Sequence, residues 1–156
     1  MKILYSINIE DYEGDIRSLK TDSLSYYSLL DILHALGSSY IVLVFNYWKQ
    51  EVMVLDGCIL AFLYNMRSGI EGLKSKNRDI SHVSSVEQGY HLRLEENNSQ
   101  IKISGFNKQY SVNLKKLESA LNEVSNRAIK DIESLYPKII ENKYYDEVKS
   151  YLINTK

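Results

Sequence analysis

The sequence predicts a single α+β domain of 156 residues, in which a mixed or mainly antiparallel sheet of about five to six strands packs with about four helices. Three observations favour this fold class. Apolar and polar residues alternate in 2–9 and again in 90–103, as in half-buried strands. Apolar residues recur at helical spacing between 114 and 135. Consecutive strand patterns lie between the helical segments, which indicates hairpins.

An acidic loop separates the first strand from the first helix. Residues 2–9 form the strand. Asp22 or Ser23 is placed to cap a helix that continues to about Leu36, because a short side chain with an oxygen can accept hydrogen bonds from the first free N–H groups. Gly37 is placed to end this helix, since glycine readily adopts the left-handed conformation of a helix C-terminus.

The middle of the chain is expected to form a hairpin followed by a second helix. Residues 39–47 are an apolar run that suits a strand covered on both faces, and 50–55 would return antiparallel to it. Asp56 is placed to cap a helix that extends to about Leu73. The polar composition of 74–89 predicts a loop.

The last third of the chain is expected to contain strands and then two helices. Residues 90–112 alternate, which predicts a hairpin or meander with one face in water. Asn113 is a good cap for the long helix that follows. Pro137 breaks this helix, because proline has no N–H to donate, and it begins a final helix over 137–152.

Composition excludes several classes of function. The formal net charge of −1 and the pI of about 6.3 weigh against nucleic-acid binding, which needs a basic surface. The lone Cys58 cannot form an internal disulfide and is expected to be a small buried hydrophobe. No stretch approaches the roughly 18 apolar residues of a membrane span, and the N-terminus begins on a strand pattern rather than a signal segment. We therefore expect a cytoplasmic protein that does not bind membranes.

Motif searches give no catalytic residue, no cofactor and no metal site. The chain has no phosphate-binding GxxxxGK[ST] loop, HExxH, CxxC or GxSxG, and three histidines spread along the sequence argue against a zinc site. His91, Arg93 and Glu95 share one face of a predicted strand and could serve acid–base chemistry, although a solvated strand face has the same pattern. Asp31 and His34 are spaced to form a helix-surface ion pair.

The acidic loop is a candidate partner-binding segment. Its four carboxylates surround a tyrosine: Glu10, Asp11, Tyr12, Glu13 and Asp15. The spacing does not match a calcium-binding EF-hand loop. The loop is either a solvated charged segment or a contact patch for a basic partner, which an acidic rim would attract and select.

The only tryptophan lies in the predicted hairpin, next to a tyrosine. Tyr47 and Trp48 fall near the hairpin end, where full burial is least expected. The Trp48 ring either staples the turn to a neighbouring helix or faces a partner. The chain has 13 tyrosines, and tyrosine suits both half-buried sheet faces and binding surfaces.

The layout resembles that of the immunity proteins of bacterial polymorphic-toxin and contact-dependent growth inhibition systems. A strand opens the chain, a helix follows "VMVLDG", and a charged hairpin precedes "YSVNLKKLESALNEVSNRAIKDI", a strand that leads into one long amphipathic helix. The resemblance lies in size and element order over most of the chain, and no functional residue carries over. It implies a non-enzymatic inhibitor that binds a cognate toxin domain in the cytoplasm. Many such toxins are basic nucleases, which an acidic, tyrosine-rich surface would suit.

The sequence thus favours a protein-binding module, most concretely a toxin-neutralising immunity protein that occludes the active site of its toxin. One alternative is a small enzyme that uses His91, Arg93 and Glu95. The other is a structural or adaptor subunit with a self-association surface. The oligomeric state does not follow from the sequence.

Overall fold

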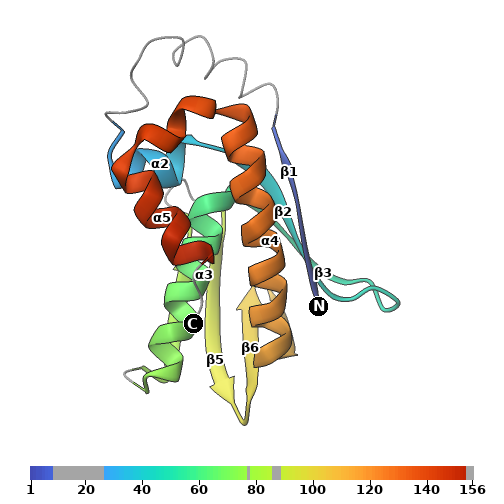
Figure 1. The fold of residues 1–156 in the computed structure, drawn as a ribbon. Helices are drawn as coiled ribbons and strands as arrows, with labels where there is room; N and C mark the ends of the chain where they lie inside the picture. Colours follow the sequence, from blue (N-terminus) through green and yellow to red (C-terminus); the bar gives the residue numbers. More distant parts are fainter. Residues whose placement is uncertain (9–26, 77, 86–88, 154–156) are drawn as a thin grey trace.

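The computed structural model describes residues 1–8, 27–76, 78–85 and 89–153. The elements lie in the order shown by colour in Figure 1. They are β1 (Lys2–Ile7), α2 (Leu29–Ala35), β2 (Ser38–Asn46), β3 (Glu51–Cys58), α3 (Ile59–Lys74), β4 (Ile80–Ser84), β5 (His91–Asn97), β6 (Gln100–Gly105), β7 (Lys108–Asn113), α4 (Leu114–Leu135), the 3₁₀ helix η2 (Pro137–Glu141) and α5 (Lys143–Ile153).

The fold is α+β, as predicted, but the strands form two sheets instead of one. Within the described residues, β1-β2-β3 make a three-stranded sheet and β4-β5-β6-β7 a four-stranded sheet, and every pairing is antiparallel. The prediction of a single sheet of about five to six strands is therefore wrong. The reason is that α3 begins directly after β3 and β4 then packs on α3, so the second group of strands does not pair with the first.

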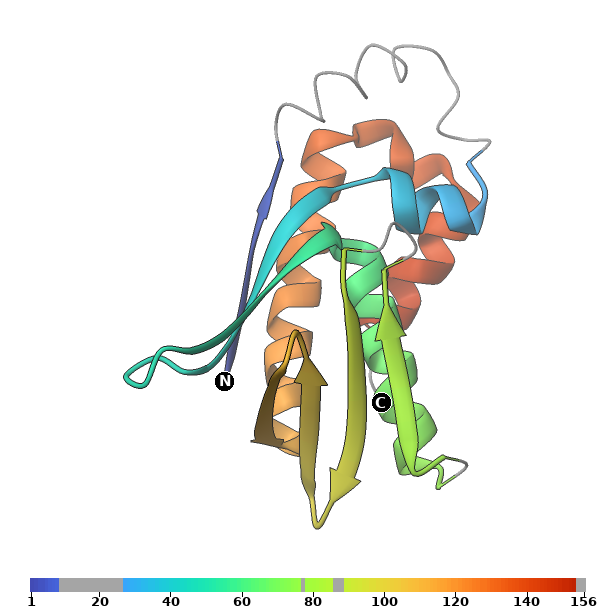
Figure 2. The same ribbon diagram turned by 180° about the vertical axis from the view of Figure 1, so that it is seen from behind.

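The sheets and the helices form separate layers. Figure 1 shows α3, α4 and α5 in front of the strands, and Figure 2 shows the same strands from behind with their outer faces uncovered by helices. Strand alternation supplies the core: Leu92 and Leu94 of β5 and Ile101 and Ile103 of β6 are fully buried, whereas their sequence neighbours are not. Burying side chains of this size stabilises a fold by roughly 1.5–3 kcal/mol each.

The first half of the chain differs from prediction at two element boundaries. The first helix begins at Leu29, where Ser28 and Asp31 form a capping box, and the predicted caps Asp22 and Ser23 lie outside the described residues. Asp56 is not a helix cap, because β3 continues to Cys58 and places Asp56 opposite Tyr40 in the sheet.

The second half also corrects two predictions. Residues 74–89 were expected to be a loop, but they contain β4, whose inward residues are the small Ser81 and Val83. Pro137 does end α4, yet it opens a short 3₁₀ helix, and the final α-helix begins only at Lys143. The predicted cap Asn113 is confirmed, since its side chain accepts a hydrogen bond from the Lys116 N–H at 3.3 Å.

Candidate functional site

The β2–β3 hairpin carries two exposed aromatic rings at its tip. Figures 1 and 2 show this hairpin extending away from the helices. The Trp48 side chain is 91% exposed and that of Tyr47 is 76% exposed, and their rings meet edge to face at 5.8 Å. The interpretation of Trp48 as a staple between the turn and a helix is therefore wrong. We call Tyr47 and Trp48 the aromatic tip.

The turn that holds the aromatic tip is ordered by hydrogen bonds of its own. The Asn46 side chain accepts from the Lys49 N–H at 3.3 Å, and the Gln50 N–H donates to the Tyr47 carbonyl at 3.1 Å. Gln50 has a φ of 52°, in the left-handed region that tight hairpin turns require. The backbone beneath the two rings thus has a defined path.

The strand ends next to the hairpin turn contact the four-stranded sheet. Phe45 stacks on Tyr110 of β7 with ring centroids 4.6 Å apart, and the Lys108 ammonium group donates to the Val52 carbonyl at 3.2 Å. The β2–β3 register shifts between Val44 and Asn46, just before the tip. These contacts hold the strands directly below the two exposed rings, which limits the entropy lost when a partner binds.

The outer face of the three-stranded sheet adds apolar surface. Leu4, Val42 and Val54 are directly opposite one another on β1, β2 and β3. Leu4 is 46% exposed, Val54 is 57% exposed, and the neighbouring Tyr40 is 56% exposed. We call Leu4, Tyr40, Val42 and Val54 the apolar strip. Apolar side chains that adjoin one another on an exposed sheet face make this strip a candidate interaction surface.

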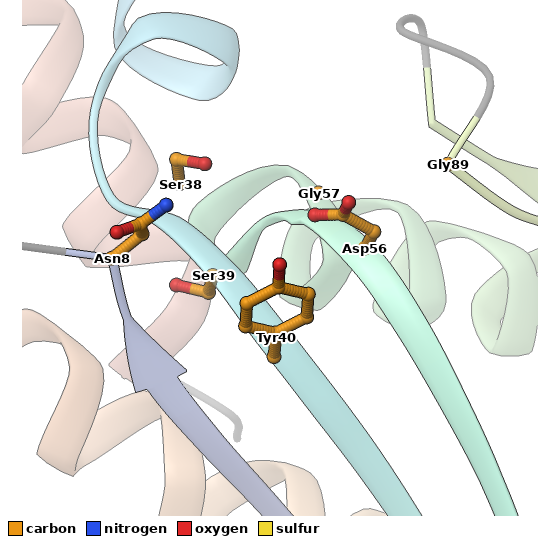
Figure 3. A pocket seen from close by; sticks show the side chains of 7 residues that line it. All are labelled: Asn8, Ser38, Ser39, Tyr40, Asp56, Gly57 and Gly89. Atoms are coloured by element: carbon orange, nitrogen blue, oxygen red, sulfur yellow. The ribbon is translucent and has the colours of Figure 1, made fainter. Parts of the chain in front are cut away.

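A polar cavity of about 250 Å³ lies at the end of the apolar strip. Figure 3 shows its lining, which comes from β2, β3, the residue after β1 and the residue before Tyr90. The lining residues are Asn8, Ser38, Ser39, Tyr40, Asp56, Gly57 and Gly89. Asp56 is the single charged residue among them, and it lies beside Tyr40 on the neighbouring strand. A carboxylate surrounded by hydroxyl and amide groups suits a cationic side chain from a partner.

The structure locates only two residues of the predicted partner-binding set. Tyr47 and Trp48 lie together at the aromatic tip. The acidic-loop residues lie outside the described residues: Glu10, Asp11, Tyr12, Glu13 and Asp15. Asn8 is the last described residue before them, and it lines the cavity.

His91, Arg93 and Glu95 share the outer side of β5, as predicted. Arg93 pairs with Glu95, and the Lys102 ammonium lies 2.9 Å from the other Glu95 oxygen. The hydrogen bond from Lys102 is the largest cause of a pKa for Glu95 below its usual range. The charges of Arg93, Glu95 and Lys102 thus pair with one another on an open face. None of the three predicted residues lines the cavity beside Asp56. Their arrangement therefore matches a solvated strand face.

Two further sequence predictions concern the Asp31–His34 pair and Cys58. Asp31 does not form the expected pair with it, because the Asp31 carboxylate accepts hydrogen bonds from the Ser28 N–H at 2.9 Å and the Ser28 hydroxyl at 2.7 Å. These bonds lower the pKa of Asp31. Cys58 is buried, as predicted, and its thiol lies 2.9 Å from the His34 carbonyl oxygen.

Sequence analysis missed His82 and Ser84, which contact His91 across the β4–β5 pairing. The His82 Nδ1 atom lies 3.1 Å from His91 Nε2, and the Ser84 hydroxyl lies 2.6 Å from His91 Nδ1. The signal available for a strand was the alternation in residues 81–84, but this stretch contains only one apolar residue, Val83.

Within the described part of the chain, no group of three or more His, Cys, Asp or Glu side chains is arranged to hold a metal ion. None of the described helices is long and apolar enough to cross a membrane.

Comparisons with models of protein families, with curated proteins and with solved structures found no match.

Proposed function

We propose that this chain is a non-enzymatic protein-binding module, and specifically an immunity protein that binds a cognate bacterial toxin domain and occludes its active site. The observation that carries the proposal is the aromatic tip. A tryptophan that is 91% exposed at the end of an extended hairpin contributes nothing to the core. Tryptophan and tyrosine are, however, the side chains most enriched among residues that dominate binding energy.

The surroundings of the aromatic tip support a protein partner. The same two strands carry the tip and part of the apolar strip, so one partner surface could cover both. The Asp56 carboxylate at the end of the strip would receive a lysine or arginine, which fits a basic toxin. Occlusion by a projecting hairpin requires shape and charge complementarity and needs no catalytic group on this chain.

The decisive experiment is co-expression with the toxin encoded next to this chain. Neutralisation should protect the cells, and the two purified proteins should form a stable complex. Trp48→Ala should weaken the complex by about 2 kcal/mol or more, which is roughly thirtyfold in Kd. Its melting temperature should stay close to that of the wild type, because substitutions of exposed residues usually change stability by less than about 0.5 kcal/mol.

The matched control is Ile140→Ala, which removes an exposed apolar side chain from η2 and should leave the Kd unchanged. Cell death together with no detectable complex would refute the proposal. Loss of melting stability in Trp48→Ala with binding intact would instead show that the ring serves the fold.

The apolar strip favours one second candidate, a subunit that associates with a further copy of itself through the three-stranded sheet. Val54→Lys places a charge in the strip, where Val54 is 57% exposed. If the strip is a self-association surface, sedimentation should show a dimer for the wild type and a monomer for this variant. A wild-type monomer at all concentrations would remove this candidate.

A further inference from the structure

Antiparallel pairing of β4 with β5 brings two of the three histidines together on the open face of the four-stranded sheet. His82 and His91 are both exposed, and their rings stack at 5.0 Å with an angle of 25° between the planes. His82 Nδ1 and His91 Nε2 are 3.1 Å apart. This site is separate from the aromatic tip and does not depend on the proposed function.

We propose that His82 and His91 form a binding site for a divalent transition-metal ion such as Zn²⁺. Imidazole nitrogens bind these ions at about 2.0–2.1 Å, so two nitrogens on one ion lie about 2.9–3.4 Å apart for bond angles between square and tetrahedral. The observed separation of 3.1 Å falls in this interval. In the metal-free protein the two nitrogens face each other across this contact, so binding of one ion requires both rings to turn until their lone pairs point to a common position.

Ser84 prepares His91 for this role. The Ser84 oxygen lies 2.6 Å from His91 Nδ1 and can accept the Nδ1 proton, which leaves the Nε2 lone pair free. His82 Nδ1–H then donates to His91 Nε2 in the metal-free protein. When the ion binds, this proton moves to His82 Nε2, so both ligands stay neutral and no net proton is released.

The support beneath the two rings is rigid. Val83 and Leu92, which pair directly across the two strands, are fully buried on the inner side of the sheet. An ion bound on the outer side would therefore link β4, an edge strand, to β5. Water would fill the remaining coordination positions, because both histidines are exposed.

Neighbouring charges limit the affinity of this site. Arg93 is directly opposite His82 in the sheet, and it shares Glu95 with Lys102, so the adjacent cluster carries two cations and one anion. With two protein ligands, the site should bind Zn²⁺ far more weakly than four-ligand structural sites do. Removing the Arg93 charge should tighten binding several-fold, whereas removing either histidine should weaken it strongly.

The test is a calorimetric titration of the untagged full chain with ZnCl₂ in a buffer that does not chelate metals, with MgCl₂ as the hard-ion comparison. The expected result is one Zn²⁺ per chain, with binding weakened more than about tenfold in His82→Gln and in His91→Gln and about tenfold in Ser84→Ala. His34→Gln is the matched control and should bind like the wild type, while Arg93→Gln should bind more tightly.

A second measurement uses stability as the readout. Zn²⁺ should raise the melting temperature of the wild type but not that of His91→Gln, because an ion that binds only the folded state stabilises it. No stoichiometric binding, or equal affinity in the wild type and the His82→Gln and His91→Gln variants, would overturn the proposal. Neither outcome affects the toxin-binding proposal, which is tested at Trp48.

Discussion

Arg67 carries a positive charge into the contact between α3 and α4. Its side chain is only 7% exposed. One guanidinium nitrogen donates to the Asn122 side-chain oxygen at 2.6 Å and to the Ser125 hydroxyl at 3.3 Å, while the Nε–H has no hydrogen-bond partner among the described residues. Burial is the main cause that lowers the pKa of Arg67 below its ordinary value. Glu71 and Glu118 partly offset this effect through their charges, but the side chains that accept hydrogen bonds from the guanidinium, Asn122 and Ser125, are neutral.

We expect Asn122→Ala to destabilise the protein more than Arg67→Met does. The alanine variant removes the closest acceptor and leaves the guanidinium buried and less satisfied, which costs about 1–3 kcal/mol. The methionine variant removes the charge together with its desolvation cost and keeps much of the apolar volume. Urea denaturation of both variants measures this difference. Equal losses of free energy of unfolding would show that packing, rather than charge satisfaction, dominates at this contact.

Single residues were predictable where local chemistry determines their role. Asn113 was identified as a helix cap because a short polar side chain preceding a periodic apolar segment has few other roles. The exposure of Trp48 could not be decided, since an aromatic ring near a turn is compatible with either packing or presentation. His82 was missed because its importance depends on a cross-strand neighbour nine residues away, and pairing alone brings the two together.

At the scale of elements, Asn142 joins three segments of the chain. It is 1% exposed, and its side-chain oxygen accepts from the N–H groups of Tyr144 and Tyr145 at 2.8 and 3.1 Å, which caps α5. Its amide group donates to the Tyr27 carbonyl at 2.9 Å. One side chain therefore starts the last helix and holds the segment that leads into α2.

We expect Asn142→Ala to cost more stability than Asn113→Ala. Both remove a helix cap, which is worth about 1 kcal/mol. Asn142 is buried, and its loss also leaves the Tyr27 carbonyl without this donor, which adds about 1–3 kcal/mol. Thermal denaturation of the two variants provides the comparison. A smaller loss at Asn142 than at the exposed Asn113 would contradict this account of the buried link.

Helices and strands were predicted correctly where apolar residues repeat clearly at helical or strand spacing, and they were missed where this pattern is weak. The long helix α4 was found with its start and its end, because many buried apolar residues repeat at helical spacing. β4 was missed, because its inner side needs the small Ser81: a Cβ atom added to Gly69 of α3 would lie 3.1 Å from the Ser81 hydroxyl. Where a helix lies this close to a strand, the strand positions that face it must hold small side chains. The strand then lacks the alternating large apolar residues by which a strand is identified in a sequence.

At the scale of the molecule, tyrosines connect the layers, and their raised pKa values should make the stability of the fold decrease at alkaline pH. Burial is the largest cause that raises the pKa values of Tyr5, Tyr90, Tyr145 and Tyr151 above the ordinary value. Tyr151 also donates to Glu71 at 2.8 Å, which links α5 to α3. A raised pKa means that the folded state keeps these protons after the unfolded state has lost them.

This contribution to stability should be fully present below the unfolded pKa of about 10 and should be lost as the pH rises further. The melting temperature should therefore fall steadily above about pH 10, and tyrosinate absorbance should show these four groups ionising only on unfolding. Tyr145→Phe should reduce the pH dependence, whereas Tyr47→Phe, at the exposed tip, should not change it. A melting temperature that is flat up to pH 11 would contradict this role of the four tyrosines.

The place where the two sheets meet could not be predicted, because it is a close contact between segments far apart in the sequence. Gly89, just before β5, lies against the end of β3, so that an added Cβ atom would be 1.8 Å from the Asp56 carbonyl oxygen. Nearby, a Cβ atom added to Gly57 would lie 3.1 Å from the Tyr90 ring. Strand patterns describe each segment separately and contain no signal for such a junction.

Gly89→Ala should therefore destabilise the whole molecule, because the clash involves backbone and cannot be relieved by turning a side chain. Overpacking of this kind costs about 1–3 kcal/mol or more. Gly72→Ala is the matched control: it lies in α3, where the nearest atom, Arg78 Cδ, would be 4.0 Å from the new methyl group. Alanine should there increase stability by about 0.5–1 kcal/mol, since glycine is a poor helix former. Urea denaturation should give opposite signs for the two variants, and a Gly89→Ala protein as stable as the wild type would mean that the two sheets do not meet at this contact.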